Sequence, residues 1–175
     1  PPSTIDWKLQ LALETEGNND SENYIGEAPA AKESLDELDQ PKPPRFQDQA
    51  SLSFSISATD GKQLLMSSDF RPSTGQGQVW NFSVSNPKRT QGRIRIIGIE
   101  SVPPGFDVVL IDAQHTVPVD LRLKNDISFR NSNASQIFHL ILGKKEFVQA
   151  KEAQLIPQEF ELSQDHVLGW RDPSL

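Results

Sequence analysis

The chain has 175 residues, a length that suits a single hydrophobic core. It contains no cysteine, so disulfides, thiolate metal sites and cysteine nucleophiles are excluded. No run approaches the roughly 20 apolar residues that cross a bilayer, and a net charge of -7 disfavours binding to nucleic acid.

The charge is unevenly distributed along the chain. Residues 1–49 hold 11 acidic and 4 basic residues, whereas residues 50–175 hold 13 of each. The basic residues of the second part are dispersed and form no stripe that would follow a phosphate backbone. We therefore expect neither nucleic acid nor membrane insertion among the interactions of this protein.

The front of the chain predicts strands on both sides of a long loop. Apolar residues occupy every second position near the start, which is the period of a half-buried strand. They are Ile5, Trp7, Leu9, Leu11 and Leu13. Residues 17–49 are polar, acidic and interrupted by proline, which predicts a loop with one short helical turn within residues 28–38. Residues 50–58 alternate again and return through residues 63–66 after an Asp60-Gly61 turn, which indicates a hairpin.

Short runs with turn residues between them continue along the chain. They predict strands at residues 78–84, 92–100, 107–111, 117–123 and 136–142. With no convincing helix among them, they favour an all-β, antiparallel immunoglobulin-like β-sandwich over residues 1–145, which includes the acidic loop 17–49. Residues 146–175 are expected to form an extended tail or linker strand. The expected core residues are Trp7, Trp80, Phe82, Leu110, Leu121 and Phe138.

The acidic loop is the one candidate metal site. Calcium takes about six to eight oxygen ligands from flexible loops, and this loop supplies carboxylates and amides close together. The predicted ligands are Asp20, Asn23, Asp36 and Asp39, with Ca²⁺ as the candidate ion. The alternative is an ordinary solvated acidic loop that holds no ion.

The sequence patterns for catalysis and for glycan binding are weaker than the pattern for the candidate metal site. His115, His139 and His166 share no ligand-like spacing, and no Gly-x-Ser-x-Gly elbow is present, so we expect no enzymatic activity. Tyr24 and Trp170 are the aromatic residues left for a surface platform on which a sugar ring stacks.

Several segments resemble the β-sandwich modules near the C-termini of large exported bacterial proteins. They are WNFSV at 80–84, PPGFDVVLID at 103–112, VDLR at 119–122 and FHLILG at 138–143, with WKL at 7–9, the loop at 17–26, DELD at 36–39 and PKPP at 41–44 upstream. The run LIPQEFELSQ at 155–164 resembles the lead-in to the sorting domain of type IX secretion cargo, although the chain then continues DHVLGW instead of that family's usual NYPNPF.

This resemblance implies an extracellular or cell-surface module within a longer protein. The leading expectation is a non-catalytic structural, spacer or adhesion module, with other domains of the parent protein as partners. One alternative is a subunit of a filament or surface layer, in which the tail adds as a strand to an identical subunit. Another is a carbohydrate-binding module of a secreted hydrolase, with a glycan as partner.

Overall fold

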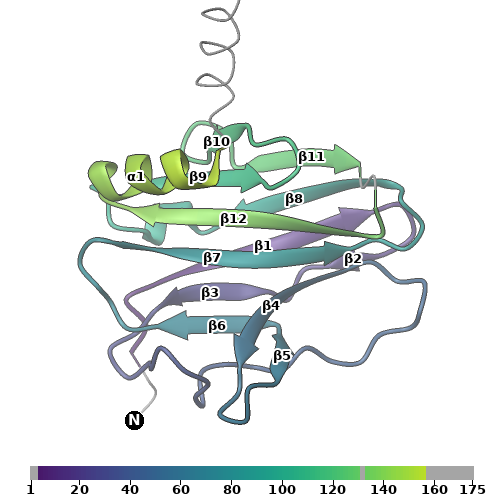
Figure 1. Cartoon of the computed structure of the whole chain (residues 1–175), viewed down its shortest axis with the longest axis horizontal. Coiled ribbons are helices and arrows are strands. Elements are labelled where there is room, and N and C mark those ends of the chain that lie inside the picture. Colours follow the sequence, from purple (N-terminus) through teal and green to yellow (C-terminus); the bar gives the residue numbers. More distant parts are fainter. Residues whose placement is uncertain (1–3, 131–132, 157–175) are drawn as a thin grey trace, which may run out of the picture.

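The computed structural model describes residues 4–130 and 133–156, which fold into two β-sheets packed face to face (Figure 1). The first sheet has the order β11-β8-β1-β3-β6, with β2 also paired to β1. Its strands are β1 (Trp7–Thr15), β2 (Asn19–Asp20), β3 (Tyr24–Glu27), β6 (Ser68–Arg71), β8 (Gln91–Ile97) and β11 (Asp126–Arg130). The second sheet has the order β10-β9-β12-β7-β4-β5. Its strands are β4 (Ser51–Ser57), β5 (Gln63–Met66), β7 (Gly77–Ser85), β9 (Asp107–Asp112), β10 (Pro118–Asp120) and β12 (Ser135–Gly143).

The core lies between the two sheets because alternating apolar residues of each sheet face inward. All six residues expected in the core are buried, at 0–3% exposure. The Trp7 and Trp80 rings meet edge to face with centroids 5.6 Å apart, which joins β1 of the first sheet to β7 of the second. The all-β sandwich expected from the sequence is therefore confirmed.

Four strands of the first sheet were not predicted, namely β2, β3, β6 and β11. β3 and β6 have four residues each and carry buried charges, including Glu27 and Asp69, so the usual apolar alternation is missing. β3 and β6 pair in parallel, with Tyr24 opposite Ser68, whereas the expectation was wholly antiparallel. The strand predicted at residues 92–100 ends at Ile97, because Gly98 turns the chain with a φ of 97° into a short 3-10 helix, η1 (Ile99–Ser101).

The helical turn expected within residues 28–38 does not form. The backbone N–H of Ala31 donates to the Ala28 carbonyl, and that of Asp39 donates to the Asp36 carbonyl, so two tight turns stand in its place. Proline and short polar residues in this stretch favour turns over continued helical hydrogen bonding.

Residues 145–155 form a helix, α1 (Lys145–Leu155), so the expected extended tail is wrong for this part of the chain; residues 157–175 lie outside the described residues. The helix lies on the outer face of the second sheet (Figure 1). Val148 is buried there against Val109, Ile111 and Ile141. This helix, the only one longer than a single turn among the described residues, is too short and too polar to cross a membrane.

A pair of glycines lets α1 approach the sheet. Gly77 and Gly143 face each other across β7 and β12, and a Cβ atom on either would lie within 3.0 Å of the Phe147 ring. Gly77 also has a φ of 154°, which side-chain-bearing residues rarely adopt. The first turn of α1 therefore rests directly on the backbone of the sheet.

Candidate functional site at Lys42

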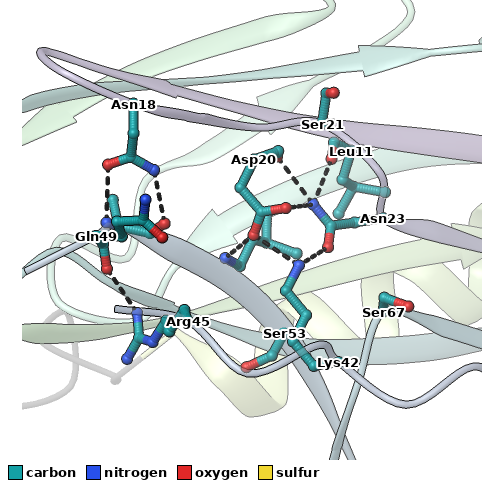
Figure 2. Close-up of polar contacts among 12 residues, drawn as sticks. Leu11, Asn18, Asp20, Ser21, Asn23, Lys42, Arg45, Gln49, Ser53 and Ser67 are labelled. Atoms are coloured by element: carbon teal, nitrogen blue, oxygen red, sulfur yellow. Dashed lines mark hydrogen bonds and ion pairs between the residues drawn. The ribbon is translucent and has the colours of Figure 1, made fainter. Parts of the chain in front are cut away.

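A partly buried cluster of one lysine, one carboxylate and one amide lies beside β2, shown in Figure 2. We call Asp20, Asn23 and Lys42 the Lys42 cluster. Asp20 ends β2, Asn23 precedes β3, and Lys42 belongs to the long segment that leads into β4. The Lys42 Nζ atom lies 2.6 Å from Asp20 Oδ2 and 2.5 Å from Asn23 Oδ1.

The Asn23 side chain is completely buried and held in one orientation. Its Nδ2 atom donates to the carbonyls of Leu11 and Asp20 at 3.1 and 3.0 Å, and lies 3.3 Å from Asp20 Oδ1. Because acceptors surround Nδ2 and the lysine faces Oδ1, every polar atom of this amide has a partner of the right kind.

Asp20 links the cluster to the second sheet. Its Oδ2 atom accepts the backbone N–H of Leu52 at 2.8 Å in addition to the Lys42 ammonium. Only 11% of the Lys42 side chain is exposed, and burial lowers the pKa of its ammonium because the charged form loses solvation. Asp20 opposes that shift by stabilising the charge.

A hollow of about 270 Å³ opens beside this cluster. Asn18 forms one wall, and its side chain pairs with the backbone of Ala50 as a strand would, donating through Nδ2 and accepting through Oδ1, both at 2.9 Å. Arg45 forms another wall and donates to the Gln49 carbonyl and to Ser85 Oγ. The polar side chains of the hollow thus fasten the segment before β4 to the body of the protein.

Asp36 and Asp39 form a separate acidic pair within the long segment after β3. Asp39 is only 6% exposed, and its two oxygens accept the backbone N–H groups of Phe70 and Asp36 at 3.0 Å each. Asp36 accepts the N–H groups of Lys32 and Leu38. Burial raises the pKa of Asp39 to about 6, against the opposing effect of its backbone hydrogen bonds.

The four predicted calcium ligands therefore fall into two separate pairs, and Asp20 of one pair and Asp36 of the other line different hollows. In one pair the Lys42 ammonium already lies between Asp20 and Asn23. Across residues 4–130 and 133–156, no three His, Asp or Glu side chains gather at a point suited to a metal. Calcium binding by these four residues stays a prediction. Lys42 was not predicted as a site residue, because a lysine within a proline-rich stretch carries no sequence signal of burial.

The remaining candidate residues lie apart from this cluster. His115 contacts Asp112 Oδ2 and His139 contacts Asn81 Oδ1, each at 2.6 Å, while His166 lies outside the described residues. Tyr24 lines a second hollow, of about 350 Å³, and donates its hydroxyl to Glu22 at 2.7 Å. Trp170 lies beyond the described part of the chain.

Asp39 makes the free energy of unfolding depend on pH, and the sign of this dependence follows from its raised pKa. Its folded pKa of about 6 lies above the roughly 3.9 of an unfolded aspartate, so the folded state binds the proton more tightly. We expect the free energy of unfolding to fall as pH rises from about 4 to about 6, relative to Asp39→Asn, whose amide does not ionise. Urea unfolding of both proteins across this range measures the difference, and a constant difference would contradict the assignment to Asp39.

Comparison of the chain with protein-family models, with curated proteins and with solved structures finds no match.

Proposed function

We propose that this chain is a non-catalytic, immunoglobulin-like β-sandwich module that serves as a structural, spacer or adhesion unit of a secreted or cell-surface bacterial protein. The observation that carries the proposal is that acidic side chains of residues 17–49 accept hydrogen bonds from distant backbone groups. Asp20 binds the backbone of Leu52, and Asp39 binds that of Phe70. These partners are 32 and 31 residues apart, so the bonds fix distant parts of the chain to one another.

Such an arrangement suits a protein that holds its shape under load. Satisfied buried polar networks give a structure rigidity, whereas partly satisfied networks do not. The acidic residues Asp20, Asp36 and Asp39 accept backbone hydrogen bonds, which favours a structural role for this segment. The immunoglobulin-like assignment is supported by two facing sheets in which spatial neighbours, such as β7 and β12, are distant in the chain.

Protease treatment of intact cells that make the protein tests the surface assignment. We expect an antibody signal against this chain to be lost when protease is added outside unbroken cells, while a cytoplasmic marker persists. A signal that protease removes only after lysis would contradict a surface role. Secretion into the medium would be seen as signal in the cell-free supernatant.

The filament alternative is supported by β11, which lies at one end of the first sheet and offers an edge for an added strand. The expected extended tail supports this alternative less, since residues 145–155 pack as a helix. Light scattering after size exclusion separates the two proposals. A single species near 19.5 kDa favours a spacer or adhesion module, and polymeric species favour a filament subunit.

The glycan alternative is supported by Tyr24, because its hollow combines this aromatic ring with Phe70 and the hydrogen-bonding side chain of Gln40. The Lys8 ammonium lies 5.3 Å from the centroid of the Tyr24 ring. A sugar would therefore have to stack on the opposite face of this ring.

A further inference from the structure

The amine of Lys42 and the amide of Asn23 are in contact at a partly buried site. Lys42 Nζ lies 2.5 Å from Asn23 Oδ1, and the amide carbon is one C=O bond of about 1.23 Å farther. The nitrogen and the carbonyl carbon are therefore within about 3.7 Å of each other, close to the roughly 3–3.5 Å separation of groups positioned to react.

The surroundings favour the amine as a nucleophile. Burial lowers the pKa of Lys42, which increases the share of neutral amine, the form that carries a free electron pair. Asn23 is 0% exposed, so water has little access to compete for its carbonyl carbon. The hydrogen bonds from Nδ2 to Leu11 and Asp20 also hold the amide still.

Asp20 is placed to carry the proton. Its Oδ2 atom lies 2.6 Å from the Lys42 nitrogen, and its Oδ1 atom lies 3.3 Å from the Asn23 nitrogen, which would be the leaving group. One carboxylate therefore reaches both the nitrogen that must lose a proton and the nitrogen that must gain one.

From this geometry we propose that Lys42 and Asn23 condense to form an intramolecular amide cross-link, with Asp20 as the general base and acid. Asp20 takes one proton from the Lys42 ammonium and gives it to Nδ2, while the freed amine forms a bond to the Asn23 carbonyl carbon and the bond from that carbon to Nδ2 breaks. Asp20 then takes a second proton from the Lys42 nitrogen and gives it to the departing ammonia. The Lys42 ammonium and the Asn23 amide become one secondary amide and an ammonium ion. Asp20 ends as it began, and no oxidant or other reactant is required.

The cross-link would tie the start of β3 to the segment that leads into β4. It would close a loop between residues 19 positions apart, which limits the unfolded chain in the way that a disulfide does. A covalent link of this kind suits a chain without cysteine. The inference does not rest on the proposed surface function, because it depends only on the three side chains of the Lys42 cluster.

Intact mass spectrometry of the purified full chain tests it. We expect a mass about 17 Da below that of the sequence, because one ammonia leaves. Lys42→Arg keeps a positive charge but replaces the amine, Asn23→Ala removes the amide and Asp20→Asn removes the proton acceptor. All three variants should show the full sequence mass. Lys62→Ala is the matched control, because Lys62 faces Asp60 at an exposed site 3.9 Å away, and it should keep the mass loss.

Digestion with trypsin separates the cross-link from simple loss of ammonia within one asparagine. The cross-link joins the fragment of residues 9–32 to that of residues 33–45, and tandem mass spectrometry places the bond at Lys42 and Asn23. The full sequence mass in the folded wild-type protein after long incubation would overturn the proposal. So would a mass loss without joined fragments. Protease results on intact cells bear only on the surface function, so the two proposals fail separately.

Discussion

Replacing Trp80 with alanine will lower the free energy of unfolding by about 3–5 kcal/mol, the usual cost of removing a large aromatic ring from a core. Trp80 is 0% exposed, packs edge to face on Trp7 and donates its indole N–H to the Asp69 carbonyl at 3.1 Å. The Arg71 guanidinium lies 4.7 Å from its ring centroid. One side chain therefore joins β7 of the second sheet to β1 and β6 of the first.

Urea unfolding followed by circular dichroism measures this effect. Phe46→Ala is the control, since Phe46 is also aromatic but 77% exposed, and its loss should change stability by less than about 0.5 kcal/mol. Equal effects at the two positions would show that Trp80 does not join the sheets as the contacts indicate.

Replacing Val148 with aspartate will release α1 from the second sheet. Val148 is 2% exposed among Val109, Ile111 and Ile141, so a carboxylate there would be buried without a partner. We expect the free energy of unfolding to fall by about 3 kcal/mol. The fall cannot exceed the docking free energy of the helix, because the chain can undock α1 instead of burying the charge. The uncovered apolar residues of the sheet should then bind a hydrophobic dye.

Gln149→Asp is the matched control for this variant. It adds the same charge to the same helix one position later, where the side chain is exposed. Dye binding and unfolding should stay close to those of the wild type. If Val148→Asp behaved in the same way as this control, α1 would not be an integral part of the domain.

Much of the fold was predictable because apolar alternation is a local signal. β1, β4, β7, β9 and β12 each have inward-facing apolar residues at every second position, and these strands were expected. β3 and β6 were not, because their buried residues include charges that only tertiary partners satisfy. Arg71 illustrates this, since it pairs with Asp69 at 2.8 Å and donates to the Val79 carbonyl of the facing sheet.

The helix α1 was not predicted either, for a related reason. Six of its eleven residues are polar, and Val148 is its one buried side chain. A helix so short gains little stability by itself, so it depends on the sheet beneath it. That docking requires the facing glycines Gly77 and Gly143, which come together only when β7 and β12 pair.

The all-β class, the expected core residues and the concentration of negative charge in residues 1–49 can be predicted from the sequence, since each depends on composition or on neighbours along the chain. The contacts of the acidic residues cannot be predicted in this way, because they depend on how the strands pair. Asp20 and Asn23 meet Lys42 rather than Asp36 and Asp39, because pairing of β2 and β3 with β1 directs them toward the segment before β4. The contacts of Asp20 and Asn23 with Lys42 depend on that pairing, which no local sequence pattern specifies.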